Sequence, residues 1–354
     1  MKAWVLNSVG NIEFSDVDIA DKPGEGHVLI KVKAAGICGS DIPRIYKDGA
    51  HNMPLIPGHE FSGMVDEIGT GVSADLKGKR VGIFPLIPCG KCSACRAQKY
   101  EMCHNYNYLG SRTDGGFAEY VEVPEWNLIA LPDKVSYEQA AMLEPMAVAV
   151  HAMRQFDPTE NDKVVICGLG TIGLLLAMFL HDAGVKNVYA IGNKAYQKNE
   201  FSKLGFPEEN FINAADIKSL TDEVMLKTGG CGADIYYDCV GSLRTITQSV
   251  NLVKEGGGVC LVGNPKSDIS FDKNDYWKIL RRQLTIKGTW NSSFLGNDEN
   301  AETDDWHYVL ERLSAGKVAP ENFISHKLKL ADLRTGLEIM RDKTEGYTKI
   351  MVIN

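Results

Sequence analysis

The stretch KVVICGLGTIGLLLAMFL, residues 163–180, decides the fold class of this 354-residue chain. It opens with a short apolar run, KVVIC, that is typical of a buried strand, and it continues into an apolar helix that we expect to end near Gly184. Between them lies GLGTIG, a G-x-G-x-x-G pattern in the strand–turn–helix setting where it indicates a dinucleotide site. The alternative is a glycine-rich turn without a ligand.

Each glycine of this loop has a separate physical task. Gly168 permits the tight turn, Gly170 lets the backbone approach a pyrophosphate, and Gly173 allows the helix to pack closely on the strand. The helix N-terminus then offers free N–H groups and a partial positive charge to the phosphates. The residues predicted to bind the cofactor at this loop are Gly168, Leu169, Gly170, Thr171, Ile172 and Gly173.

The alternation of strand and helix continues after the loop. Four more short apolar runs, with helical stretches between them, are NVYAI (187–191), DIYYDC (234–239), GVCLVG (258–263) and LTIKG (284–288). This order predicts an α/β fold with a parallel, doubly wound Rossmann sheet over roughly 151–290.

The flanking segments have a different pattern. Residues 1–150 contain the strand-like runs KAWVL, HVLIKVKA and FAEYVEV and are predicted to be β-rich. Residues 291–354 contain an amphipathic helical pattern at 304–317 and a strand-like end, TKIMVIN. We expect 1–150 and 291–354 to be the two parts of a second domain, which carries the catalytic groups.

Composition narrows the function classes. Hydrophobic residues make up 44% and charged residues 24% of the chain, as in ordinary globular proteins. The formal net charge of -8 argues against a nucleic-acid partner, because phosphate binding needs a basic face. No apolar run is long enough to span a bilayer, and MKAWVLNSVG lacks the apolar region of a signal peptide. We therefore expect a cytoplasmic protein with no membrane partner and with reduced cysteines.

The end of the second predicted strand bears on the choice of cofactor. An NAD site usually has a carboxylate there for the ribose hydroxyls, whereas Gly192, Asn193 and Lys194 occupy this turn. A carboxylate would repel a 2′-phosphate and Lys194 would attract one, with Lys198 in support. These three turn residues are therefore predicted to bind the cofactor and to favour NADP(H) over NAD(H). The alternative is that Lys194 is a solvated surface charge.

A cluster of cysteines predicts a metal site. The spacing C-x2-C-x2-C-x7-C joins Cys89, Cys92, Cys95 and Cys103. In a reducing compartment such a cluster is more typical of metal ligands than of disulfides. Four thiolates fill the tetrahedral shell of zinc and leave no open position, so this zinc is predicted to be structural. The alternative is four free thiols in one lobe.

A second set of possible metal ligands is dispersed along the chain. Cys38 lies in GICGSD, His59 and Glu60 lie in PGHEFSG, and Glu144 lies in AAMLEPMAVAVHA. A catalytic zinc needs three protein ligands and one open position, which a cysteine, a histidine and a carboxylate can supply. Taken singly, each has another interpretation: a small core residue, a loop histidine and a surface acid at a helix end.

Together these residues resemble the zinc-containing medium-chain dehydrogenase/reductase family. The resemblance spans nearly the whole chain and includes GHE at 58–60, the four-cysteine lobe, Glu-Pro at 144–145 and GLGTIG, in that family's order. It implies a GroES-like catalytic domain beside the Rossmann domain. Within the family, 36–63, 109–120 and 278–294 are similar to polyol and sugar-phosphate dehydrogenases, above all the galactitol-1-phosphate 5-dehydrogenases.

The resemblance implies roles for the matching residues. Glu60 would lie beside the catalytic zinc and replace water during turnover, Ser40 would relay the substrate hydroxyl proton, and Asp41 would orient the metal-binding imidazole. The catalytic zinc would be bound by Cys38, His59 and Glu144, and the structural zinc by Cys89, Cys92, Cys95 and Cys103.

The chain departs from the family at two positions. Pro43 stands where many members have a histidine that completes the proton relay. Gly192 replaces the acid that galactitol-phosphate members usually keep, and Gly-Asn-Lys resembles the Gly-Ser-Arg of NADP-dependent bacterial secondary alcohol dehydrogenases. These departures bear on the proton exit, the cofactor and the substrate.

We therefore expect an enzyme that transfers a hydride between NAD(P) and a secondary hydroxyl of a polyol or sugar-alcohol phosphate. It would hold two zinc ions per chain and form a homodimer or homotetramer. Arg44 and Arg112 are candidate substrate contacts, since a phosphate needs a cation, and Asn291 is a candidate polar contact in the pocket. The alternatives are an NADP-dependent secondary alcohol or butanediol dehydrogenase, a zinc-free quinone reductase, and a non-enzymatic zinc-ribbon module with a nucleotide-binding domain.

Overall fold

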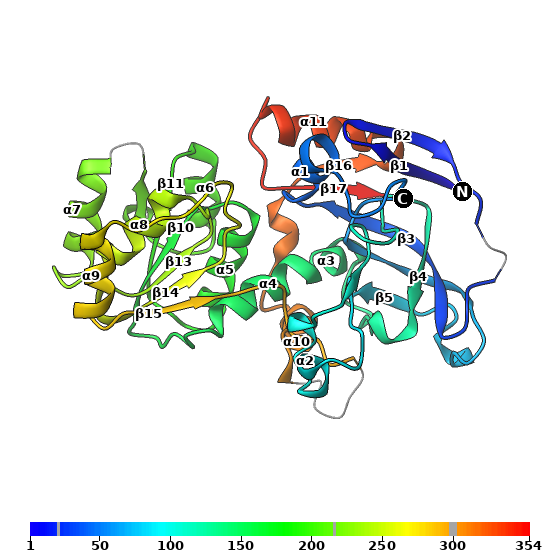
Figure 1. Cartoon of the computed structure of the whole chain (residues 1–354), viewed down its shortest axis with the longest axis horizontal. Coiled ribbons are helices and arrows are strands. Elements are labelled where there is room, and N and C mark those ends of the chain that lie inside the picture. Colours follow the sequence, from blue (N-terminus) through cyan, green and yellow to red (C-terminus); the bar gives the residue numbers. More distant parts are fainter. Residues whose placement is uncertain (20–21, 215–216, 297–302) are drawn as a thin grey trace. The chain divides into compact units, whose positions relative to one another are not determined.

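The computed structural model describes residues 1–19, 22–214, 217–296 and 303–354. The chain divides into two compact units (Figure 1). Unit 1 comprises Met1–Ala147 and Ser292–Asn354, and unit 2 comprises Val148–Asn291. Unit 2 is therefore inserted between the two segments of unit 1.

A parallel sheet forms the centre of unit 2. Its described strands run in the order β12 (Phe211–Asn213), β11 (Asn187–Gly192), β10 (Lys163–Cys167), β13 (Ala233–Asp238), β14 (Val253–Leu261) and β15 (Thr285–Gly288). Every pair along this path is parallel. The chain starts at β10, runs outward to β12, and then crosses to β13. This is the strand order of a Rossmann fold, so the predicted doubly wound sheet is confirmed.

Helices connect these strands. They are α5 (Thr171–Asp182), α6 (Ala195–Lys203), α7 (Ile217–Lys227), α8 (Leu243–Leu252) and α9 (Lys273–Arg281). The run Val164, Val165 and Ile166 in β10 is fully buried, as expected for a strand covered on both faces. After α5 the chain turns at Gly184, which has a φ of +82°. The predicted end of that helix is therefore confirmed.

Unit 1 contains a larger, mainly antiparallel sheet. Its described strands run in the order β16 (Ile324–Lys329), β17 (Lys349–Ile353), β3 (His27–Ile37), β4 (Glu60–Ile68), β5 (Arg80–Ile83) and β9 (Leu128–Ala130), and β8 (Tyr120–Pro124) also pairs with β3. Strand β17 lies between β16 and β3, so the two segments of unit 1 share one sheet. The predicted β-rich character is confirmed.

Smaller elements surround this sheet. The strands are β1 (Lys2–Ser8), β2 (Asn11–Asp16), β6 (Leu86–Ile87) and β7 (Asn107–Tyr108). The helices are α1 (Asp41–Pro43), α2 (Ser93–Arg96), α3 (Tyr137–Ala141), α4 (Leu143–Met153), α10 (Asp305–Ser314) and α11 (Leu333–Asp342). The predicted strand at 117–123 begins only at Tyr120, because Phe117 and Ala118 pair with β1 instead. None of the described helices combines the length and apolar character that a bilayer span requires.

Candidate active site

The antiparallel pairing of β3 and β4 brings two distant motifs together. Gly36 in β3 lies opposite Glu60 in β4, so Cys38, just after β3, lies near His59, just before β4. The ligand atoms of Cys38, His59 and Glu60 all lie within 4.8 Å of one another. His59 is 4% exposed and Glu60 is 1% exposed. Because thiolate, imidazole and carboxylate are the ligands that zinc takes in proteins, these residues fit a zinc ion.

Asp41 links the loop after β3 to the histidine. Its Oδ2 accepts a hydrogen bond from the Cys38 amide at 3.0 Å, and its Oδ1 accepts one from Arg44 Nη1 at 2.5 Å. His59 Nδ1 lies 3.5 Å from Asp41 Oδ1. Burial opposes ionisation, but the charges of His59 and Arg44 keep the pKa of Asp41 below its usual value. A carboxylate facing Nδ1 leaves Nε2 for a metal, which is the orienting arrangement expected for Asp41.

Ser40 lies on the same loop, next to the candidate metal ligand. Its hydroxyl donates a hydrogen bond to the Cys38 sulfur at 3.3 Å. The hydroxyl is therefore close to the proposed metal position, as a proton relay requires. The relay role of Ser40 stays a prediction.

Glu144 lies at the start of α4, where it meets an aromatic side chain that the sequence analysis missed. The Tyr108 hydroxyl donates a hydrogen bond to Glu144 Oε1 at 3.2 Å, and the Tyr108 ring packs edge-on against His59 with centroids 5.9 Å apart. Burial, with the nearby Glu60 carboxylate, raises the pKa of Glu144 to about 7. The group of side chains that could hold a metal thus contains Glu60 in place of Glu144. Glu144 interacts electrostatically with His59 and Glu60, and its role as third zinc ligand stays a prediction.

Lys349 is the second side chain that the sequence analysis missed. It begins β17 and forms a buried ion pair with Glu60. Burial alone would lower the pKa of Lys349, but Glu60, Cys38 and Glu144 hold it above its usual value. The only sequence signal was a lysine at the start of an otherwise apolar strand, and a lysine there usually faces solvent.

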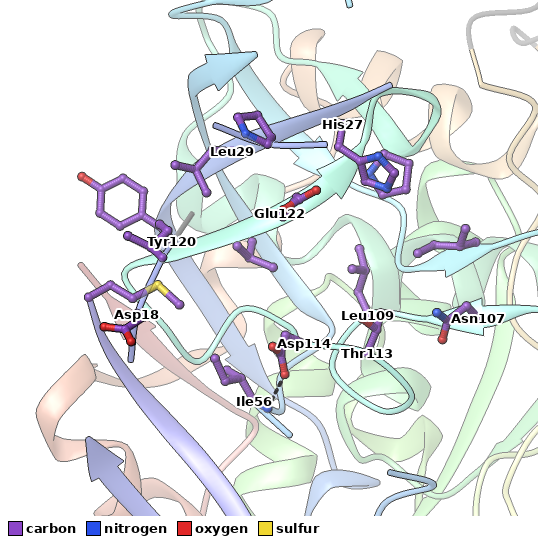
Figure 2. Close-up of a pocket in the computed structure, with 16 residues that line it drawn as sticks. Asp18, His27, Leu29, Ile56, Asn107, Leu109, Thr113, Asp114, Tyr120 and Glu122 are labelled. Atoms are coloured by element: carbon purple, nitrogen blue, oxygen red, sulfur yellow. Dashed lines mark hydrogen bonds between the residues drawn. The ribbon is translucent and has the colours of Figure 1, made fainter. Parts of the chain in front are cut away.

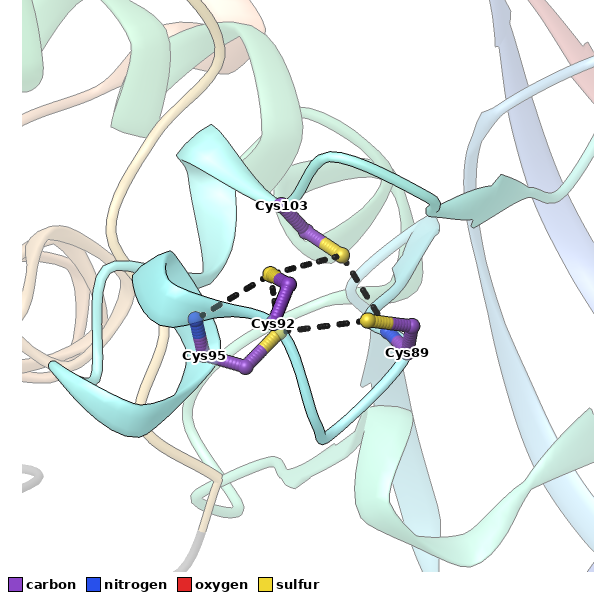
Figure 3. Close-up of side chains that lie close together, drawn as sticks. All are labelled: Cys89, Cys92, Cys95 and Cys103. Atoms are coloured by element: carbon purple, nitrogen blue, oxygen red, sulfur yellow. Dashed lines mark hydrogen bonds between the residues drawn. The ribbon is translucent and has the colours of Figure 1, made fainter.

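The four-cysteine lobe is compact. Figure 3 shows the four sulfurs directed toward one another, and all four lie within 4.8 Å. The Sγ–Sγ distances are 3.9 Å for Cys89–Cys95, 3.5 Å for Cys92–Cys95 and 3.9 Å for Cys92–Cys103. A zinc–sulfur bond of about 2.3 Å gives a tetrahedron with sulfurs about 3.8 Å apart, so the lobe fits a zinc ion. All nine cysteines are free.

Backbone N–H donors lower the pKa of a thiol in this lobe, whereas burial raises it. The amides of Cys95 and His104 lower the pKa of Cys92 to about 6. Burial, with the neighbouring thiols, raises the pKa of Cys95 to about 12. A cation between the sulfurs is what would allow all four to ionise together.

The glycine loop of unit 2 has the geometry that its sequence predicts. Gly168 has a φ of +95°, and a Cβ there would lie 2.5 Å from the Val240 side chain. A Cβ at Gly173 would lie 2.0 Å from the Gly168 carbonyl oxygen, so the helix packs directly on the turn. A Cβ at Gly170 would meet nothing within 4 Å. The space beside Gly170, at the N-terminus of α5, fits a pyrophosphate group.

The turn after β11 is held by a side chain that the sequence analysis did not consider. Gln197 Oε1 accepts hydrogen bonds from the amides of Asn193 and Lys194 at 3.1 and 3.2 Å, and Nε2 donates one to Leu169 O at 3.0 Å. Gln197 therefore ties the two predicted cofactor loops together. Lys194 is exposed, whereas Lys198 pairs with Glu208 at 3.0 Å.

The three predicted substrate residues have different surroundings. The Arg44 charge is engaged by Asp41, as described above. The Arg112 guanidinium stacks 4.2 Å above the Tyr106 ring and donates a hydrogen bond to its carbonyl at 3.1 Å. Asn291 is buried and has a φ of +59°, which asparagine tolerates better than most residues. Substrate contact by these residues stays a prediction.

A cavity of about 430 Å³ lies elsewhere in unit 1 (Figure 2). The carboxylates of Asp114 and Glu122 are among its lining groups, but they already accept backbone hydrogen bonds from Ile56 and Gly24. The Cys38–His59–Glu60 cluster does not line this cavity. We therefore assign no catalytic step to it.

Comparisons with known proteins identify the family. Residues 24–133 match the alcohol dehydrogenase GroES-like domain, and residues 171–315 match the zinc-binding dehydrogenase model. The chain is 32% identical to galactitol 1-phosphate 5-dehydrogenase of Escherichia coli K12 over 330 residues, which cover 92% of both chains. The chain belongs to the zinc-containing medium-chain dehydrogenase family. Like the family, it has a GroES-like domain and a Rossmann domain, and it is an oxidoreductase.

Further relatives and solved structures are 28–32% identical to this chain. L-threonine 3-dehydrogenase of Pyrococcus horikoshii is 32% identical, with 96% of this chain and 95% of that one covered. The structure of galactitol-1-phosphate dehydrogenase from Escherichia coli has a TM-score of 0.89 and 30% identity, with both chains fully covered. 2R,3R-butanediol dehydrogenase of Bacillus subtilis has a TM-score of 0.85 and 28% identity, with 100% and 99% covered. A Sinorhizobium meliloti structure bound to NADP scores 0.87 at 28% identity, with the same coverage.

Replacing Asp41 by asparagine tests the orienting role of this carboxylate. Asp41→Asn should lower zinc retention or kcat/KM by about 10–100-fold, because the negative charge facing His59 Nδ1 is lost. Zinc per chain after dialysis against a chelator and initial rates measure this effect, and Asp75→Asn, at an exposed position, is the control. An Asp41→Asn protein with wild-type zinc content and rate would contradict the assignment.

Replacing Cys103 by serine tests the four-cysteine lobe. Cys103→Ser should lower the zinc content from two ions to one and lower the melting temperature, because three thiolates no longer close the shell. Elemental analysis and thermal unfolding measure both effects. Cys231→Ser, which changes an exposed cysteine outside the lobe, should leave both unchanged. Two retained zinc ions in Cys103→Ser would show that the lobe is not a metal site.

Proposed function

We propose that this zinc-containing dehydrogenase interconverts a secondary hydroxyl of a polyol or sugar-alcohol phosphate with the corresponding ketone, and that it prefers NADP(H). The observation that carries the dehydrogenase chemistry is the Cys38–His59–Glu60 cluster, in which His59 and Glu60 are buried and His59 Nδ1 faces the Asp41 carboxylate. The similarity to galactitol 1-phosphate 5-dehydrogenase over 92% of the chain supports the substrate class.

In this proposal, Cys38, His59 and Glu144 hold the catalytic zinc. The metal supplies a Lewis acid that lowers the pKa of the substrate hydroxyl and polarises the ketone in reverse. Ser40, beside the Cys38 sulfur, takes the hydroxyl proton toward solvent. Asp41 would hold the His59 ring with Nδ1 toward its carboxylate, which would leave Nε2 for the metal.

The cofactor is held by backbone and charge. The nicotinamide carries the hydride, and the protein supplies its position. The amides at the start of α5 bind the pyrophosphate, with Gly170 giving the close approach. The 2′-phosphate would lie near Lys194, at the start of α6, because Gly192 stands where an NAD site usually has a carboxylate.

The second candidate function is an NADP-dependent secondary alcohol or butanediol dehydrogenase. The pairing of Arg44 with Asp41 favours it, because a guanidinium held by a buried carboxylate is less available to a substrate phosphate. The two candidates share the zinc chemistry and differ only in what lies beyond the reacting carbon.

Initial rates against a panel of ketose phosphates, ketoses and simple ketones distinguish the two candidates. With the polyol-phosphate function, kcat/KM should be highest for a ketose phosphate, because the phosphate adds charge-assisted contacts that a simple ketone lacks. A higher kcat/KM for simple ketones than for ketose phosphates would indicate a secondary alcohol dehydrogenase. Absence of turnover with every carbonyl compound and both cofactors would refute the proposed function.

Substitution of Lys194 tests the cofactor preference. Lys194→Ala should raise KM for NADPH by about tenfold and leave KM for NADH unchanged, because one charge-assisted contact of about 1.5 kcal/mol is lost. Steady-state rates with both cofactors give the result. Lys186→Ala, a lysine at the opposite end of β11, is the matched control. A wild-type preference for NADH would show that Lys194 does not select the cofactor.

A further inference from the structure

Lys349 places a positive charge in the interior of unit 1. Its side chain is 2% exposed, and Nζ donates hydrogen bonds to Glu60 Oε2 and, at 3.2 Å, to the Ile37 carbonyl oxygen. An ammonium group is costly to remove from water and is buried only where its partners are well placed. The proposed mechanism gives Lys349 no task, although it lies beside the candidate metal ligands.

When zinc is bound, the Glu60 carboxylate can interact with either of two cations, the Lys349 ammonium group or the metal. It faces Lys349, and it also belongs to the cluster whose ligand atoms lie within 4.8 Å of Cys38 and His59. Zinc accepts a carboxylate oxygen at about 2.0–2.2 Å, so a modest rotation would bring Glu60 into its coordination shell. The carboxylate now lies against Gly36, where a Cβ would stand 2.3 Å from Oε2. The backbone of β3 thus leaves room for Glu60 on the lysine side.

The positive charge of Lys349 balances the negative charge of Glu60. The Cys38 thiolate and the Glu144 carboxylate would balance the two charges of zinc, and Asp41 is paired with Arg44. Glu60 is then left with Lys349 as its cation. Without that lysine, Glu60 would be a buried carboxylate whose strongest neighbouring cation is the metal.

We infer that Lys349 is a positioning residue that draws Glu60 away from the zinc coordination shell. The fourth position is then open when the substrate oxygen binds, and Glu60 enters it only in exchange for water or substrate. This inference rests on the proposed function, in which Cys38, His59 and Glu144 bind the catalytic zinc. It gives the buried ion pair a role in metal chemistry in addition to its role in packing.

Lys349→Met keeps a long unbranched side chain and removes the charge. Glu60 should then bind the metal as a fourth ligand. The chelator-induced loss of the catalytic zinc should become at least about tenfold slower, and kcat/KM should fall by a similar factor. In the cobalt(II)-substituted protein, the visible spectrum should no longer respond to added substrate. A purely structural role for Lys349 would instead loosen the site and make metal loss faster.

Two further variants complete the test. Lys349→Arg keeps the charge and should retain wild-type metal release and the substrate-dependent cobalt spectrum. Lys349→Met combined with Glu60→Gln removes both members of the pair and should restore the wild-type rate of metal loss. Faster metal loss in Lys349→Met, or slow loss that persists in the double variant, would overturn the inference. A wild-type protein without zinc or without turnover would refute the proposed function itself, so the two failures are distinguishable.

Discussion

The proposed zinc site depends on the pairing of β3 with β4 and with β17. Strand β4 places Glu60 opposite Gly36, and β17 places Ile350 opposite Ile37, so the ends of three strands meet where Cys38 leaves the sheet. Gly36 is required at this crossing, because any larger residue would displace the Glu60 carboxylate. Strand register, more than local sequence, therefore determines which side chains surround the proposed metal position.

Two of the buried carboxylates at this site have cationic partners. Asp41 is paired with Arg44 and faces His59, while Glu60 is paired with Lys349. A metal site built from a thiolate and carboxylates is negative until the cation arrives, and paired neighbours add no further net charge to it.

The sequence was most informative where structure is local. The glycine loop, β10 and α5 could be predicted from local sequence. A strand buried on both faces is a continuous apolar run, and a tight turn requires glycine at fixed positions. The spacing of four cysteines within 15 residues likewise predicted one lobe. The family resemblance then supplied the connection between Cys38, His59 and Glu144, which spacing alone left open.

Contacts between residues far apart in the chain could not be predicted from local sequence. Lys349 and Glu60 are 289 residues apart, and a lysine beginning a strand is normally solvated, so nothing nearby marked it as buried. Tyr108 and Gln197 were missed for a related reason. Tyr108 is hydrogen-bonded to Glu144, and Gln197 is hydrogen-bonded to the Leu169 carbonyl. Both contacts result from the fold and leave no pattern in the nearby sequence.

The insertion of unit 2 into unit 1 has a consequence for biosynthesis. A ribosome completes Cys38, His59, Glu60 and Glu144 before it makes unit 2, and it makes β17 only afterwards. At about 5–20 residues per second, the interval between Glu60 and Lys349 is on the order of tens of seconds. During that time the nascent N-terminal segment has the proposed metal ligands but lacks Lys349, the ion-pair partner of Glu60 in the finished sheet. Zinc that binds before Lys349 is made would therefore bind a more negative set of side chains than zinc that binds to the finished sheet, because the lysine charge is still missing.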